Sequence, residues 1–189
     1  LRDTEFPPFQ QAIRYGVAGL MTAHVLYRAL DPEAPATLSS AVIQRLLREE
    51  FRYEGVVFTD DLEMHAIIDH DGIGEAAVRS FVAGCDVLLI CKDQDRVMTA
   101  MQAMERAVKD GRITQERLDQ SLARVAKLKA RYLHPYKPVT ISDARLVVGC
   151  RSHKVLLDSW HKAYARIPKP TLVERGQAAP AHDSPVTHV

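Results

Sequence analysis

The chain has 189 residues, of which 47% are hydrophobic, so it is long and apolar enough for one domain with a packed core. Its 25 lysine and arginine residues nearly balance its 24 aspartate and glutamate residues, which argues against a nucleic-acid partner or an anionic membrane surface. No apolar run approaches the ~18 residues of a membrane span, and no segment resembles a signal peptide.

The first two thirds of the chain alternate helical and strand patterns. We expect helices at residues 6–13, 39–51, 75–82, 95–109 and 114–134, and strands at residues 18–25, 56–59 and 86–91. Ser39 and Thr114 are expected to cap their helices. Apolar strands separated by helices predict an α/β fold with a parallel sheet, and either a doubly wound sheet or part of a (β/α)₈ barrel fits this order.

The helical pattern weakens after Pro138. We expect two further helices, at residues 143–149 and 153–165, which form a short C-terminal extension within residues 137–189. Residues 168–189 are rich in proline, alanine and polar side chains, so they predict a disordered tail.

The three cysteines are Cys85, Cys91 and Cys150, an odd number with no metal-ligand spacing. Two of them lie in or beside an apolar run, so we expect buried, reduced thiols rather than a redox or metal site. This usage suits a reducing compartment.

The stretch "GVVFTDDLEM" ends an apolar strand in two carboxylates, Asp60 and Asp61. In parallel α/β folds the chemistry gathers at the carboxyl ends of strands, which is where Asp60 stands. The residues alone leave turn capping and catalysis equally open for Asp60, whereas capping is favoured for Asp61. Because neighbouring strand residues point to opposite faces, the two carboxylates are not expected to share one task. A magnesium site of Asp60, Asp61 and Glu63 is therefore a weaker alternative.

His24 ends the preceding strand, in the stretch "MTAHV". A histidine at such a place is often a hydrogen-bonded structural residue, and a role at the site has about equal weight.

Three segments closely resemble glycoside hydrolase family 3, above all the bacterial β-N-acetylglucosaminidases. They are "GLMTAHVLYRALD", "PATLSSAVIQRLLREEFRYEGVVFTDDLEM" and "GCDVLLIC", and the resemblance extends over residues 6–136. It implies that residues 1–136 form a partial (β/α)₈ TIM barrel, about its last three βα units. The implied activity is that of a retaining glycosidase that releases terminal β-linked N-acetylglucosamine from peptidoglycan fragments in the bacterial cytoplasm.

The resemblance also implies roles for single residues. Asp60 would be the catalytic nucleophile, with Asp61 shaping its surroundings, and His24 would line the sugar pocket. Leu62 would meet the acetamido group of the sugar. The partner would be a carbohydrate, with no metal and no organic cofactor.

The family pattern has parts that this sequence lacks. Strands one to five have no counterpart, and neither does the "KHFPGHG" type of motif near which the family carries its acid/base histidine. We therefore expect a fragment, or a chain that pairs with the missing N-terminal half-barrel. A β-glucosidase-type relative and a non-catalytic, degenerate barrel remain alternatives.

Overall fold

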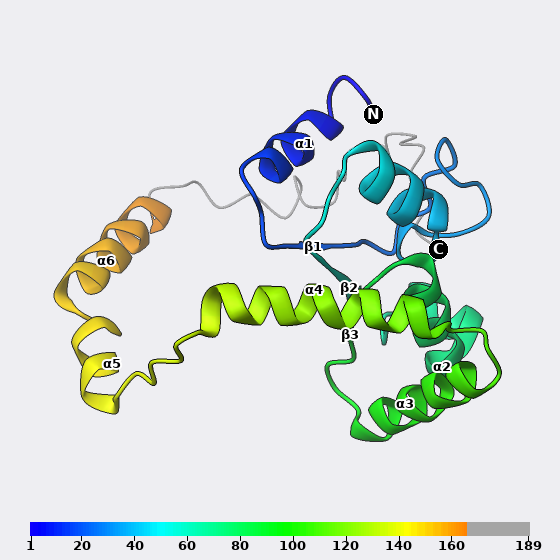
Figure 1. Ribbon diagram of the computed structural model, residues 1–189. Coiled ribbons are helices and arrows are strands. Elements are labelled where there is room, and N and C mark those ends of the chain that lie inside the picture. Colours follow the sequence, from blue (N-terminus) through cyan, green and yellow to red (C-terminus); the bar gives the residue numbers. More distant parts are fainter. Residues whose placement is uncertain (166–189) are drawn as a thin grey trace. The chain divides into compact units, whose positions relative to one another are not determined.

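The structure is a computed structural model that describes residues 1–165, apart from the side chains of residues 68–71. The chain forms two units, of which the first covers Leu1–Tyr132 and the second begins at Leu133. Helices and strands alternate along the first unit, which contains the sheet and the candidate site (Figure 1).

A parallel sheet of three strands lies at the centre of the first unit. The strands are β1 (Gly19–Met21), β2 (Val56–Asp61) and β3 (Val87–Leu89), and they pair in the order β1-β2-β3. All three carboxyl ends therefore meet at one edge of the sheet. The predicted α/β class is confirmed. Three strands are too few to close a barrel, so the predicted (β/α)₈ barrel stays a prediction.

Helices precede and follow each strand of the first unit. They are α1 (Phe6–Arg14), the short 3₁₀ helix η1 (Ala36–Leu38), the π-helix η2 (Ala41–Glu50), α2 (His65–Ala83), α3 (Gln94–Lys109) and α4 (Gln115–Leu133). The hydroxyl of Ser39 accepts a hydrogen bond from Val42 N, and that of Thr114 accepts one from Arg117 N. Both predicted caps are confirmed.

The segment after β2 differs from the prediction. We expected a loop up to Gly74, but α2 already begins at His65 and continues through a kink at Gly72, where φ is 67°. Ile67 and Ile73 are buried in the core and bring this segment onto the sheet. Gly72 and the polar residues between the two isoleucines interrupt the helical spacing of apolar residues in the sequence. The helix is stabilised by tertiary packing instead. Gly84, with φ of 124°, ends α2 as expected.

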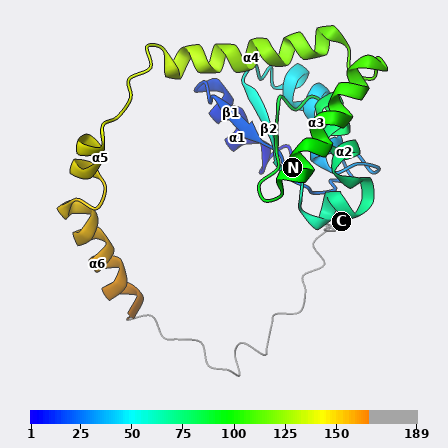
Figure 2. The ribbon, with the colours of Figure 1, turned by 90° about the horizontal axis from the view of Figure 1, so that it is seen from below.

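Buried side chains hold α2 and α3 against one another and against the sheet. Leu62, Ile67 and Ala76 are fully buried and form one cluster with Ala100 of α3. The two helices lie side by side in both ribbon views (Figure 2). Burying an isoleucine or leucine completely stabilises a fold by roughly 1.5–3 kcal/mol, so this cluster gives the strand ends a rigid support.

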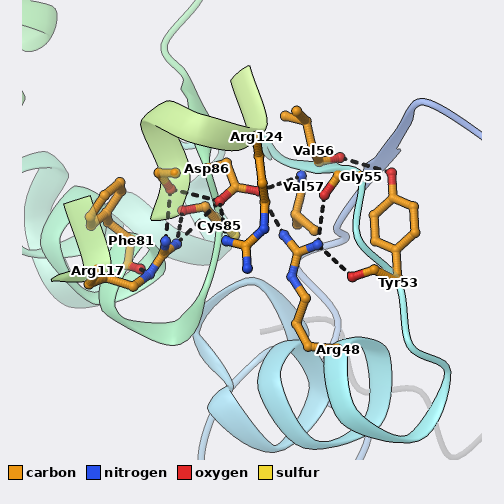
Figure 3. Close-up of polar contacts among 11 residues, drawn as sticks. Arg48, Tyr53, Gly55, Val56, Val57, Phe81, Cys85, Asp86, Arg117 and Arg124 are labelled. Atoms are coloured by element: carbon orange, nitrogen blue, oxygen red, sulfur yellow. Dashed lines mark hydrogen bonds and ion pairs between the residues drawn. The ribbon is translucent and has the colours of Figure 1, made fainter. Parts of the chain in front are cut away.

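The opposite end of the sheet is organised by Asp86, whose carboxylate has no exposed surface (Figure 3). Its donors come from η2, β2 and α4: Arg48 Nη2 at 2.7 Å, Val57 N at 3.0 Å, Ser121 Oγ at 2.6 Å and Arg124 Nη1 at 3.2 Å, with Arg117 Nη2 at 3.5 Å as a further ion pair. One buried carboxylate thus ties three elements together, and the charge-assisted bonds offset the desolvation of the acid.

The second unit contains α5 (Ile141–Val147) and α6 (Arg151–Ala165), close to the two predicted helices. Thr140 caps α5 by accepting a hydrogen bond from Asp143 N at 3.1 Å. The tail expected at residues 168–189 lies outside the described residues. Within the part of the chain that the structure describes, no helix has both the length and the apolar character needed to cross a membrane.

Candidate active site

A bulge interrupts β2 beside the candidate nucleophile. Phe58 pairs with Val87 and Asp61 pairs with Leu89, so β2 uses one residue more than β3 between these two pairs. The extra residue falls at Thr59–Asp60. Bulges occur often beside active sites, because they redirect a side chain and end the regular pairing of a strand.

A side chain replaces the backbone acceptor that the bulge removes. The amide of Leu89 donates to the hydroxyl oxygen of Thr59 at 2.9 Å, and Thr59 is completely buried. The Leu89 carbonyl in turn accepts a hydrogen bond from Leu62 N at 2.9 Å. The end of β3 therefore remains joined to β2 on both sides of the bulge.

The carboxylate of Asp60 is held by the backbone amide of the next residue. Its oxygen Oδ1 accepts a hydrogen bond from Asp61 N at 2.8 Å, and the residue is half-buried. Among the described residues, no second hydrogen bond reaches this carboxylate. One oxygen is thus oriented by an N–H donor, and the other is left for a ligand or reacting atom.

Asp61 shapes the turn that follows. Its carboxylate accepts a hydrogen bond from Glu63 N at 3.1 Å, and its carbonyl accepts one from Met64 N at 3.1 Å. The capping role favoured for Asp61 matches this turn, although the turn lies before α2 rather than at the helix itself.

His24 is buried, with 5% of its surface exposed, and both ring nitrogens have protein partners. Nδ1 lies 2.8 Å from the hydroxyl of Thr37 in η1, and Nε2 lies 2.9 Å from the carbonyl oxygen of Asp61. The structure thus brings His24 to the candidate site. Its expected contact with a sugar stays a prediction, which this geometry does not favour because neither nitrogen is free.

Leu62 is completely buried and packs with Leu38, Ile67 and Ile73. Its expected contact with an acetamido group also stays a prediction. The structure does not favour it, because the side chain points into the core and has no accessible surface.

Glu63 holds the loop after β3. Its carboxylate accepts hydrogen bonds from the backbone N–H groups of Cys91 at 2.9 Å, Lys92 at 2.6 Å and Asp93 at 3.2 Å, and only 4% of the side chain is exposed. Its oxygens are therefore directed at this loop and not at Asp60. Within the described residues, no group of three histidine, cysteine or acidic side chains is placed to hold a metal ion.

The cysteines differ from one another in environment. Cys85 is buried, and burial raises the pKa of its thiol to about 12, as expected for an inert core residue. Cys91 is exposed beside the candidate site, so the expectation of a buried thiol is wrong there. Desolvation and the nearby carboxylate of Asp61 raise the pKa of Cys91.

Sequence reasoning missed the bulge at Thr59 and the partnership of His24 with Thr37 and Asp61. The local signal for the bulge is a threonine placed between an apolar run and the two aspartates. The contacts of His24 join segments that are 13 and 37 residues apart, and no spacing rule predicts them.

Comparison with known proteins identifies relatives of this chain. The family model described as the glycosyl hydrolase family 3 N terminal domain matches residues 1–128. A β-hexosaminidase of Nitrosomonas eutropha is 37% identical over 131 residues, which are 68% of this chain and 37% of that protein. A β-hexosaminidase of Thioalkalivibrio sulfidiphilus is 31% identical and covers 82% of this chain, with 43% of its own length matched.

A solved structure shows that the fold is similar as well. The glycoside hydrolase family 3 β-N-acetylglucosaminidase from Paenibacillus sp. str. FPU-7 superposes with a TM-score of 0.69 and 44% sequence identity, over 76% of this chain and 27% of that protein. The chain thus spans less than half the length of each of these relatives. Because the family model covers more than half of its residues, the chain belongs to glycosyl hydrolase family 3.

Proposed function

We propose that this chain carries the catalytic nucleophile, Asp60, of a retaining β-N-acetylhexosaminidase. The observation that supports this most directly is the place of Asp60, in a bulge at the carboxyl end of a parallel strand, with one carboxylate oxygen held and the other unpaired among the described residues. The names of the relatives support the class of substrate.

In the proposed reaction, the Asp60 oxygen Oδ2 attacks the anomeric carbon of the sugar while the bond to the leaving oxygen breaks. The hydrogen bond from Asp61 N keeps Oδ1 oriented, so that Oδ2 faces the substrate. Water then cleaves the glycosyl ester and restores the carboxylate. The leaving oxygen needs a proton from a second group, and we do not assign this role to His24, because its ring is held by Thr37 and Asp61.

The proposed substrate is a terminal β-linked N-acetylglucosamine on a peptidoglycan fragment in the bacterial cytoplasm. The proposed partner is a half-barrel that supplies the remaining strands, since the described sheet has three. The proposed substrate and partner rest on the relatives. The match with the solved Paenibacillus structure covers only 27% of that protein.

The test is hydrolysis of 4-nitrophenyl N-acetyl-β-glucosaminide by the chain and by its Asp60→Asn variant. Each is assayed alone and after adding the part of the Nitrosomonas eutropha β-hexosaminidase that this chain does not match. We expect Asp60→Asn to lower kcat by on the order of 10³-fold or more. Asp95→Asn, an exposed aspartate at the start of α3, is the matched control.

Two results would contradict the proposal. The first is activity that survives Asp60→Asn, and the second is a wild-type chain that is inactive in both forms of the assay. The second would favour the non-catalytic alternative. A solved relative of 26% identity is described as a β-glucoside phosphorylase, so 4-nitrophenyl β-glucoside is assayed in parallel, and a higher kcat/KM on the glucoside would reassign the substrate.

A further inference from the structure

The imidazole of His24 stands where the pairing of β1 with β2 stops. Among the described residues, the last backbone hydrogen bond from the β1 side runs from Thr22 N to Phe58 O at 2.9 Å. Beyond it the chain leaves the sheet, and the carbonyl of Asp61 receives His24 Nε2 instead. A side chain thus supplies the hydrogen bond that a neighbouring strand supplies elsewhere in a sheet.

The hydrogen bonds of His24 define which ring nitrogen carries the proton. A carbonyl oxygen only accepts, so Nε2 carries the proton that is donated to Asp61. In the neutral ring Nδ1 is then an acceptor, and the Thr37 hydroxyl donates to it at 2.8 Å. The Thr37 oxygen can accept in turn from the hydroxyl of Thr22, also at 2.8 Å. One continuous chain of donors therefore leads from the end of β1 to the end of β2.

Asp61 is held from both neighbouring strands. His24 fixes its carbonyl from the β1 side, and the next amide, Leu62 N, donates to Leu89 O on the β3 side. The amide of Asp61 itself donates to the carboxylate of Asp60. The peptide groups around Asp61 therefore have little freedom to rotate, and the orientation of the Asp60 carboxylate follows from theirs.

We propose that His24 is a positioning residue for the nucleophile Asp60, and that it acts through the backbone of Asp61 rather than on the sugar. This inference rests on the proposed function. His24 is 5% exposed, and both ring nitrogens bond to protein atoms, so the structure leaves it no free group for a substrate. A misplacement of about 1 Å at a reacting group can lower a rate about 10²-fold, which is the scale on which such a residue matters.

Two variants separate the hydrogen bonds of His24. In His24→Gln the side-chain amide nitrogen can reach the place of Nε2, so the bond to the Asp61 carbonyl can persist. In His24→Asn the shorter side chain reaches only the place of Nδ1, so the bond to Thr37 can persist and the bond to Asp61 is lost. With 4-nitrophenyl N-acetyl-β-glucosaminide, we expect His24→Asn to lower kcat about 10- to 100-fold with KM changed less than about twofold.

His24→Gln is expected to keep kcat within about threefold of the wild type. A larger loss in His24→Gln than in His24→Asn would mean that anchoring Thr37 is what matters, and a rise in KM with kcat unchanged would mean that His24 binds the sugar. Either result would overturn the inference.

A second measurement needs no activity and separates this inference from the proposed function. Amide hydrogen exchange at Leu62, followed by NMR on the full chain, should become about tenfold faster in His24→Asn and stay unchanged in His24→Gln. The ¹⁵N shifts of the wild-type ring should show the tautomer with the proton on Nε2. Equal exchange in the two variants, or the other tautomer, would overturn the inference even in an active enzyme, whereas an inactive wild type with the expected exchange would overturn the proposed function alone.

Discussion

The amide of Leu89 and the hydroxyl of Thr59 form a hydrogen bond of 2.9 Å across the bulge of β2. Thr59 has no exposed surface, and the Leu89 amide is partly buried. The hydroxyl therefore replaces a strand carbonyl as the acceptor, and β2 can bend at Asp60 without leaving the Leu89 amide unpaired.

Replacing Thr59 by valine keeps the shape of the side chain and removes this acceptor. We expect Thr59→Val to lower the free energy of unfolding by about 1–2 kcal/mol, because the partly buried Leu89 amide would lose its hydrogen-bond partner. Urea unfolding followed by circular dichroism measures the change. Thr99→Val, at a threonine whose hydroxyl bonds Asp95 O on the exposed side of α3, serves as the control and should change stability by less than about 0.5 kcal/mol. Equal losses in the two variants would contradict this role of Thr59.

The elements of the fold were predictable where the signals are local. Ser39 and Thr114 cap helices as their spacing indicates, and the apolar run before Asp60 forms a parallel strand. These features depend on residues within one turn or one strand, which the sequence displays directly. The helical start of α2 was missed because its stability comes from burying Ile67 against other elements and not from a regular apolar stripe.

The site was predictable only in part. A carboxylate at the end of a strand indicates chemistry, and Asp60 stands at the carboxyl edge of the sheet as expected. The bulge and the hydrogen bond between His24 and Asp61 depend on how two strands meet in space. Leu62 illustrates the same limit, since its burial depends on α2 and η1 packing over it.

Glu63 should control the order of the loop after β3. Its carboxylate accepts from three successive amides, those of Cys91, Lys92 and Asp93, and charge-assisted bonds are stronger than neutral ones. In Glu63→Gln the amide group can replace only part of these acceptors. We expect hydrogen exchange at the three amides to become about tenfold faster, as measured by NMR, while exchange in α4 stays unchanged.

The control for this loop is Glu105→Gln, at an exposed glutamate of α3. It changes the charge of the chain by the same amount and should leave the three amides as they are. Unchanged exchange in Glu63→Gln would show that the backbone alone orders the loop.

Within the part of the chain that the structure describes, Asp86 is the carboxylate shared by Arg48, Arg117 and Arg124, whose side chains are 7%, 11% and 23% exposed. Removing its charge would leave these guanidinium groups largely buried without compensation. We expect Asp86→Asn to lower the free energy of unfolding by about 3–5 kcal/mol, measured by urea unfolding.

The matched control is Asp110→Asn, at an exposed position that ends α3. It should change stability by less than about 0.5 kcal/mol. A loss below about 1 kcal/mol in Asp86→Asn would show that the arginines find other partners, and would contradict a structural role for the Asp86 charge.

Tyr53 should make the fold sensitive to alkaline pH. Burial raises the pKa of its phenol to about 12, against an ordinary value of 10.0, and its hydroxyl donates to Val56 O at 3.2 Å. Because the pKa is higher in the folded chain, the neutral phenol contributes stability below pH 10.0, and this contribution is lost as the pH rises towards about 12. The loss amounts to roughly 2–3 kcal/mol.

The variant Tyr53→Phe tests this. We expect its free energy of unfolding to be about 1 kcal/mol lower than that of the wild type near neutral pH, because the hydrogen bond is lost. Between pH 10.0 and about 12, its free energy of unfolding should decrease less than that of the wild type. Urea unfolding at several pH values measures both effects, with Tyr15→Phe, at a side chain that is 82% exposed, as the control. A wild type and a Tyr53→Phe variant that lose stability in parallel over this range would show that the phenol of Tyr53 ionises without opposing the fold.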